Sequence, residues 1–205
     1  MAEKLYLYPK WVRLWHALNA LFILCLIITG VSMQYSNPGY GFIRFDIAVS
    51  IHNIAGMLLT ANYLFFFLGN FLTPNGKYYK LTVKGLFQRL TTQFVYYTFG
   101  IFRHEKAPFP VTKESKFNPL QQFTYVMAMY FMVPIVFITG WALLYPEVLF
   151  QKVLGASGLK INDFIHVIIG FLLSFFMFVH IDFCTIGATF VSNFKSMVTG
   201  YHEPH

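Results

Sequence analysis

The sequence predicts an all-α integral membrane protein, a bundle of four membrane-spanning helices formed by a single domain over residues 1–205. Three observations predict this class. Of the 205 residues, 57% are hydrophobic, and only 11% are charged, whereas soluble domains have about 25% charged residues. Finally, four apolar stretches are each long enough to cross a bilayer, which requires about 20 residues.

The expected spans cover residues 14–35, 48–72, 123–145 and 164–191. The first follows three basic residues and so resembles a signal peptide. Its apolar run is too long for one, however, and no small-residue cleavage site follows it. We therefore expect a retained first helix.

Residues 73–122 form a long loop between the second and third spans. Within it, residues 81–102 are apolar but interrupted by polar and charged side chains. This pattern favours an amphipathic helix lying in the membrane interface, with a fifth span as the alternative.

Basic residues predict the orientation of the bundle. The N-terminal segment, the long loop and the C-terminal region contain twelve Lys and Arg residues, and the opposite side has only Arg44, Lys152 and Lys160. By the positive-inside rule, both termini and the long loop are cytoplasmic. The net charge of +7 is thus a topology signal, and no nucleic-acid partner is expected.

Four of the seven histidines lie within the expected spans: His16, His52, His166 and His180. Ionisable residues inside a bilayer are costly and usually functional. One such histidine could be a packing residue, but four at related depths favour a cofactor role. A small residue follows each of them by one turn, which would leave room for a flat group: Ala20, Gly56, Gly170 and Cys184.

Depth within the membrane pairs these histidines. His166 and His180 are 14 residues apart, or about 21 Å along one helix and nearly on one face. With the predicted topology, His16 and His180 lie towards the cytoplasm, and His52 and His166 lie towards the outside.

Two histidines at each site do not suit structural zinc, which takes four ligands. They do suit haem iron, for which imidazole is a common axial ligand. We therefore expect two b-type haems, one held by His16 and His180 and the other by His52 and His166. The haems would be non-covalent, because the chain has no Cys-x-x-Cys-His motif. With both axial positions filled, such sites transfer electrons.

These residues resemble the four-helix di-haem cytochrome b subunits of bacterial formate dehydrogenases, nickel-iron hydrogenases and thiosulfate reductases. The resemblance covers nearly the whole chain, and the histidine pattern is its most specific part. The other matching segments are Arg13-Leu14-Trp15-His16, Thr29-Gly30, Asn118-Pro119-Leu120-Gln121, Thr139-Gly140 and Met197-Val198-Thr199-Gly200-Tyr201-His202.

The resemblance implies a subunit in the bacterial inner membrane with a site for menaquinone or ubiquinone beside the cytoplasmic haem. Asn118, Gln121 and His180 are the candidate quinone-binding residues. Asn118 is equally suited to cap a helix that begins at Pro119. Asp182 could deliver protons to the quinone, or could simply solvate the end of its helix.

Arginines near the haems are candidates to pair with haem propionates: Arg13 on the cytoplasmic side and Arg44 outside. Interfacial anchoring is the ordinary role of such residues. The resemblance also implies an iron–sulfur or multihaem c-type cytochrome subunit, which would dock outside near Arg44, Lys152 and Lys160. Electrons would then cross the membrane between this partner and the quinone pool.

Two other functions stay open from the sequence. One is a free-standing cytochrome b that oxidises a small reductant such as superoxide. The other is a haem-free membrane anchor or permease whose histidines line a proton path.

Overall fold

The computed structural model describes residues 4–36, 42–148, 151–153, 156–187 and 189–202. Four helices in this part of the chain are long and apolar enough to cross a membrane, as predicted. They are α1 (Lys10–Gln34), α2 (Phe45–Leu72), a composite helix over Pro119–Leu144, and α6 (Gly158–Cys184). The segment 81–102 contributes none of them.

The composite third helix consists of α4 (Pro119–Met127), a single π-helical turn η4 (Ala128–Met132) and α5 (Val133–Leu144). The Val133 N–H reaches back to the Ala128 carbonyl, five residues earlier. Pro134 follows and has no N–H to continue the usual bonding pattern. The wide turn accommodates this missing donor.

All four helices start three to six residues before the predicted positions, and the fourth also ends earlier than predicted. The third starts at Pro119 rather than 123, because Asn118 caps it. The fourth spans Gly158–Cys184 rather than 164–191. Its first turns are polar enough to look like a loop, but Asn162 is buried there and donates to the Thr139 carbonyl at 2.9 Å. Beyond Cys184 the chain turns and forms a separate helix, α7 (Ser192–Thr199).

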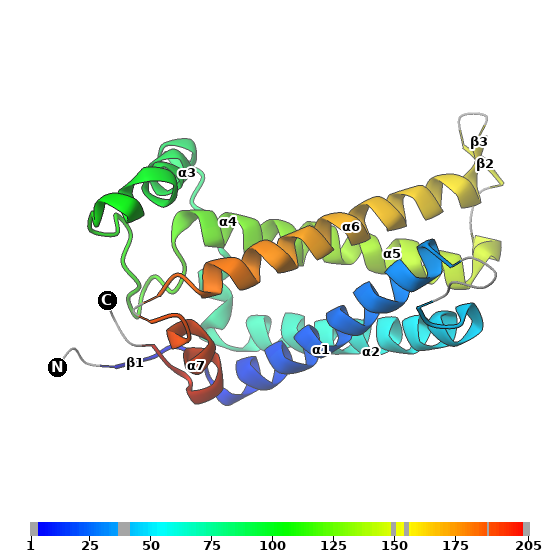
Figure 1. Cartoon of the computed structure of the whole chain (residues 1–205), viewed down its shortest axis with the longest axis horizontal. Coiled ribbons are helices and arrows are strands. Elements are labelled where there is room, and N and C mark those ends of the chain that lie inside the picture. Colours follow the sequence, from blue (N-terminus) through cyan, green and yellow to red (C-terminus); the bar gives the residue numbers. More distant parts are fainter. Residues whose placement is uncertain (1–3, 37–41, 149–150, 154–155, 188, 203–205) are drawn as a thin grey trace.

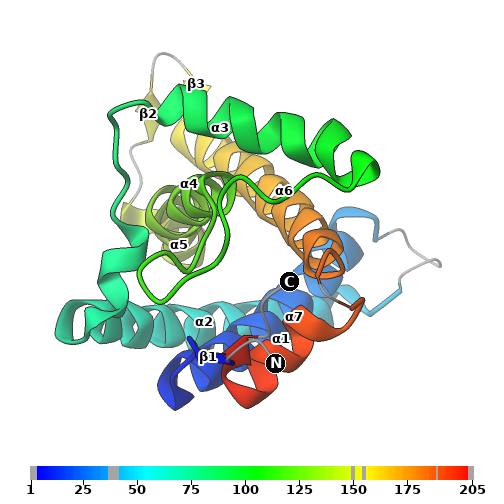
Figure 2. The same cartoon turned by 90° about the vertical axis from the view of Figure 1, so that its left-hand side faces the viewer.

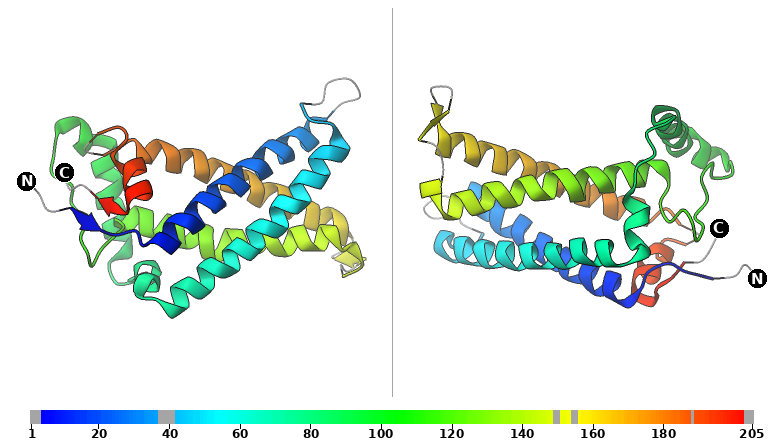
Figure 3. Two further views of the ribbon diagram at one scale, coloured as in Figure 1. Left: turned by 90° about the horizontal axis from the view of Figure 1, so that it is seen from below. Right: turned by 180° about the vertical axis from the view of Figure 1, so that it is seen from behind.

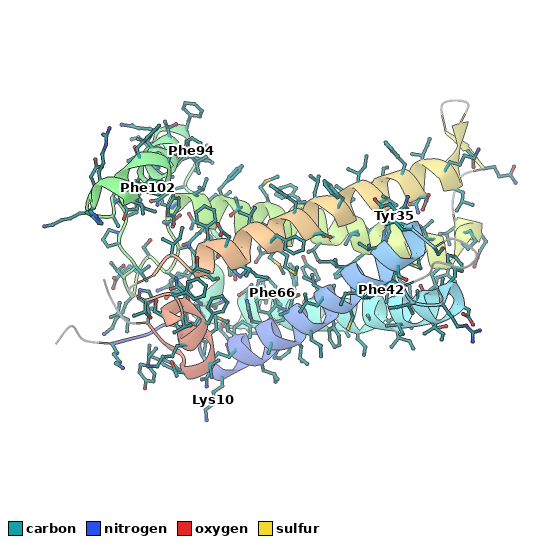
Figure 4. All side chains as sticks on the ribbon, in the orientation of Figure 1. Lys10, Tyr35, Phe42, Phe66, Phe94 and Phe102 are labelled. Atoms are coloured by element: carbon teal, nitrogen blue, oxygen red, sulfur yellow. The ribbon has the colours of Figure 1, made fainter. Side chains whose placement is uncertain are left out.

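The four spans form two hairpins (Figures 1 and 3). The N-terminal hairpin consists of α1 and α2, and the C-terminal hairpin consists of α4, α5 and α6. In the N-terminal hairpin, Trp15 stacks on Phe66 with ring centroids 4.1 Å apart, and Val12 completes this core cluster. Phe66 lies inside the bundle in Figure 4 and is fully buried.

Outward-facing side chains of the spans are largely apolar. On α6, Phe164, Phe171, Phe175 and Phe178 are all more than 60% exposed. Such a surface suits contact with lipid acyl chains, as expected for helices that cross a bilayer.

The long loop contains η1 (Pro74–Tyr79), α3 (Leu86–Val95), η2 (Tyr96–Gly100) and η3 (Ile101–Arg103). In Figure 2, α3 lies across the end of the bundle beside α4 and α6. Its Gln93 side chain is buried, whereas Phe87 and Phe94 are exposed. This two-faced helix is too short to be a fifth span.

Both described chain ends lie at the α3 end of the bundle (Figure 1). There β1 (Leu5–Tyr6) pairs antiparallel with β4 (Tyr201–His202). Gly200 has φ +90, and its carbonyl accepts from the Leu7 and Tyr8 amides. A Cβ at this position would lie 2.8 Å from the Tyr8 carbonyl oxygen, so glycine suits the turn for two reasons.

At the opposite end lie η5 (Pro146–Val148), β2 (Lys152–Val153) and β3 (Ala156–Ser157). The two strands form a short antiparallel pair ahead of α6.

Candidate functional site

The four histidines of the spans form two pairs, with the partners expected from their depth. The His16 and His180 rings have centroids 6.1 Å apart. Those of His52 and His166 are 6.4 Å apart. Each pair takes one histidine from the N-terminal hairpin and one from the C-terminal hairpin.

These separations fit one metal ion between each pair of imidazoles. Metal–imidazole bonds are about 2.0 Å long, and each nitrogen lies roughly 1.1 Å from the centre of a ring with bonds near 1.33 Å. Two imidazoles on opposite sides of one metal therefore have centres about 6.2 Å apart. Among the described residues there is no cluster of three or more His, Cys, Asp or Glu side chains suited to a metal. The ring separations are those of two imidazoles that hold one metal ion between them.

In the pair nearer the β2–β3 end, which we call the outer pair, each ring contacts a buried threonine. Thr29 Oγ1 of α1 lies 2.9 Å from His52 Nδ1, and Thr139 Oγ1 of α5 lies 3.0 Å from His166 Nδ1. Each threonine is followed by a glycine that faces the same ring. A Cβ on Gly140 would lie 3.0 Å from His166 Cε1. The repeated Ile-Thr-Gly at 28–30 and 138–140 was the available sequence signal for this arrangement.

The pair nearer the chain ends, which we call the inner pair, has different surroundings. His180 Nδ1 lies 3.3 Å from the Tyr125 hydroxyl, and its ring stacks on Phe176 at 6.0 Å. The Cys184 sulfur lies 3.8 Å from His180 Nε2. On the other side, Asn62 of α2 donates to the Trp15 carbonyl next to His16, which fixes α1 against α2. We find no hydrogen bond to the His16 ring within the described ranges.

The small residues after the histidines agree with a flat group beside the outer pair. A Cβ on Gly170 would meet nothing within 4 Å, and one on Gly56 would reach only the Leu26 side chain at 4.0 Å. Space is therefore left on the helix faces that carry His166 and His52.

Asn118 and Gln121 form a reciprocal cap at the start of α4. Gln121 N donates to Asn118 Oδ1 at 2.9 Å, and Asn118 N donates to Gln121 Oε1 at 3.2 Å. Asn118 Nδ2 also donates to the Tyr97 hydroxyl at 2.7 Å. The capping role is therefore observed, and Tyr97 joins the set, with its ring 4.8 Å from that of Phe183. Burial raises the pKa of the Tyr97 hydroxyl.

One groove of about 560 Å³ lies between α3 and the segment that follows η3. None of its lining residues is a candidate haem or quinone residue: Phe87, Gln88, Thr91, Thr92, Val95, Tyr96, Glu105, Lys106 and Pro108.

The two candidate propionate arginines have protein partners. Arg13 donates to the Val198 carbonyl of α7, and its Nε is buried. Arg44 forms an ion pair with Asp46 at 2.9 Å and is 77% exposed.

Asp182 is exposed at the end of α6, which agrees with solvation of that end. Lys160 is exposed, and the Lys152 side chain lies outside the described part.

Lys116 is a buried cation that the sequence did not single out, because it lies among the many basic residues of the loop. Its side chain is 3% exposed. Nζ lies 4.3 Å from the Tyr8 ring centroid and 3.4 Å from Asn75 Oδ1. Burial lowers the pKa of Lys116 from 10.5 to about 7, and burial raises the pKa of Tyr8 to about 12.

Paired histidines at two depths, set among four apolar helices, define a membrane-bound b-type cytochrome. The chain belongs to the prokaryotic cytochrome b561 family, which it matches over residues 7–200. It is also 40% identical over 201 residues to the Escherichia coli (strain K12) protein named "Putative cytochrome YdhU", covering 98% of this chain and 76% of that one. No solved structure matches it.

Family membership confirms the expected class of protein, a multi-pass membrane cytochrome that binds b-type haem and transfers electrons. It also excludes the haem-free anchor as a description of this chain.

Proposed function

We propose that the chain is the quinone-reactive, di-haem cytochrome b subunit of a respiratory oxidoreductase in the bacterial inner membrane. It would carry electrons between a redox partner outside the membrane and the quinone pool. The observation that supports this most directly is the presence of two histidine pairs, each spaced for one iron. Their members on α6, His166 and His180, are 14 residues apart.

Each haem, when bound, supplies an iron that gains and loses one electron. His16 and His180 would hold one iron, and His52 and His166 the other. A histidine on each side of the iron would leave no open position for oxygen or another substrate, so such a site would serve electron transfer. The apolar helices keep water away from both sites.

The inner end of the bundle is the better place for the quinone. It carries most of the basic residues, and the positive-inside rule assigns it to the cytoplasm, where protons for a reduced quinone are available. Asn118, Gln121 and Tyr97 lie there together. Tyr125, one turn after Gln121 on α4, contacts His180. Polar side chains of this kind can donate hydrogen bonds to quinone oxygens.

The outer end would face the partner, which we expect to contain iron–sulfur clusters or several c-type haems. Arg44 and Lys160 are exposed there. The charge of Lys160 would attract an acidic group of the partner, whereas that of Arg44 is already paired with Asp46.

Removal of single histidines tests the di-haem assignment. The chain purified in detergent should contain two haems b per polypeptide by pyridine haemochrome analysis. His166→Ala should remove the outer haem and leave the inner one, and His180→Ala should do the reverse. One haem in the unaltered chain, or loss of both haems in each variant, would contradict the pairing.

Purification and quinol assays test the rest of the proposal. A soluble menaquinol or ubiquinol analogue should reduce the inner haem faster than the outer one. His180→Ala, which lacks the inner haem, should slow reduction of the outer haem by the same quinol. A redox partner should co-purify from native membranes. A chain that purifies alone and is reduced rapidly by superoxide would instead identify a free-standing cytochrome.

A further inference from the structure

We propose that Thr29 and Thr139 are positioning residues, which fix the tautomer and ring orientation of His52 and His166 so that each presents Nε2 to the outer iron. This inference rests on the proposed di-haem function. It assigns a role to two hydroxyl groups that touch the ligands but not the iron.

The direction of each hydrogen bond follows from the other contacts of the hydroxyl. Thr29 Oγ1 lies 2.7 Å from the Cys25 carbonyl oxygen, and Thr139 Oγ1 lies 2.8 Å from the Ile135 carbonyl oxygen. A hydroxyl has one proton to donate, and a carbonyl oxygen can only accept. Each threonine therefore donates to its own helix and accepts a proton from the imidazole Nδ1.

The tautomer follows from this direction. A neutral imidazole carries its proton on one nitrogen, and the other nitrogen has a free lone pair. With the proton on Nδ1, both His52 and His166 have Nε2 free for a metal. Hydrogen bonds to the non-ligating nitrogen commonly orient metal-bound histidines in this way.

Neighbouring contacts hold the threonines in place. Asn162, one turn before His166 on α6, donates to the Thr139 carbonyl at 2.9 Å. Gly140 lets the His166 ring approach the helix that carries Thr139, since a Cβ there would lie 3.0 Å from His166 Cε1. Thr29 and Thr139 come from different hairpins, so the same threonine–histidine hydrogen bond occurs on both sides of the outer pair.

The inner pair lacks this arrangement. His180 Nδ1 has a longer contact, 3.3 Å, with the Tyr125 hydroxyl. The outer pair is therefore the more tightly constrained, and the hydroxyls should affect one haem selectively.

The test compares Thr139→Val, which keeps the shape and removes the hydroxyl, with Thr139→Ser, which keeps the hydroxyl. A hydrogen bond accepted from Nδ1–H makes the imidazole a stronger electron donor. Thr139→Val should therefore shift the midpoint potential of the outer haem to more positive values and change its low-spin ferric EPR signal. It should also weaken retention of that haem by roughly 10-fold or more. Thr139→Ser should resemble the unaltered chain, and Thr29→Val should act in the same direction as Thr139→Val.

Ser50→Ala is the matched control. Ser50 lies on α2, two residues before His52, and its hydroxyl donates to the Asp46 carbonyl at 2.9 Å without touching a histidine. It should leave both potentials unchanged. If Thr139→Val and Thr29→Val keep the potential and EPR signal of the outer haem, the inference is wrong while the di-haem proposal stands. If His166→Ala retains both haems, the di-haem proposal itself fails.

Discussion

Single residues decide how closely helices approach the candidate haem ligands, and the two Thr-Gly pairs show this best. The glycines are not equivalent, since a Cβ on Gly140 would lie 3.0 Å from His166 Cε1, whereas one on Gly30 would lie 3.5 Å from His52 Cε1. The first distance forces the ring to move, and the second is an ordinary contact.

Gly140→Ala should therefore weaken haem binding at the outer site, and Gly30→Ala should not. Overpacking of this kind costs about 1–3 kcal/mol, whereas alanine in a helix gains about 1 kcal/mol over glycine. Thermal unfolding of the haem-loaded protein in detergent and the haem-to-protein ratio measure both effects. Equal behaviour of the two variants would contradict the difference in ring clearance.

Lys116 gives the protein a stability that depends on pH. Its pKa is about 7 in the folded chain and 10.5 in the unfolded one, so between these values the unfolded chain binds more protons. Stability should rise with pH in this window, by at most about 1.4 kcal/mol per pH unit. Below pH 7 Lys116 is charged in both the folded and the unfolded chain, so the folded chain is destabilised by the full cost of burying that charge.

Lys116→Met should accordingly be more stable than the unaltered chain at pH 6, with a gap that narrows as the pH rises from 7 to 9. Thermal unfolding at several pH values measures the gap. Lys113→Met is the control, because that lysine is exposed. A gap independent of pH would show that Lys116 does not titrate in this range.

At the scale of elements, Asn118 combines a structural role with a candidate binding role, and two substitutions separate them. Asn118→Ala removes the cap of α4 and should cost about 1 kcal/mol of stability. Asn118→Asp keeps the capping oxygen but loses the donor to Tyr97. If Asn118 also donates to a quinone, both variants should slow quinol oxidation, although only the first is less stable. If Asn118→Asp oxidises quinol at the normal rate, Asn118 serves only as the cap of α4.

The sequence predicted these elements to different degrees. Apolar length was sufficient for the four spans, and depth alone paired His16 with His180 and His52 with His166. The predicted start of α6 was wrong because the polar residue Asn162 indicated a loop. Asn162 is buried because its side chain donates to the Thr139 carbonyl. The burial of Lys116 and the contacts of the Thr29 and Thr139 hydroxyls could not be predicted. They depend on how neighbouring helices are rotated against one another, and the sequence pattern of a single helix does not specify that rotation.

At the scale of the whole molecule, the candidate haem sites lie between the two hairpins. The hairpins also touch directly along α2 and α5, where Trp141 Nε1 donates to Thr60 at 3.3 Å and the Tyr63 and Phe137 rings lie 5.3 Å apart. Between α1 and α6, in contrast, the described ring contact is the one between His16 and His180. Bound haem should therefore stabilise α1 and α6 more than α2 and α5.

Hydrogen exchange measured by mass spectrometry tests this unequal stabilisation. Chains produced under haem limitation should exchange faster in α1 and α6 than haem-loaded chains, with smaller changes in α2 and α5. Ligands that bind only the folded state stabilise it by mass action. A uniform change across all four helices would instead indicate that haem supports the bundle as one unit.

The π-helical turn η4 has a consequence for the evolution of this chain. Tyr125 precedes the turn and contacts His180, while Thr139 follows it and contacts His166. The turn thus lies between two contacts that serve different histidine pairs. Deleting one residue from the regular helix at 135–138 would rotate one half of the helix against the other by about 100°, so only one of the two contacts could survive. A deletion at 128–132 would instead close the wide turn to an ordinary α-helical one. Insertions and deletions in the regular helix between η4 and Thr139 should be far less tolerated than in the loops at either end of the bundle.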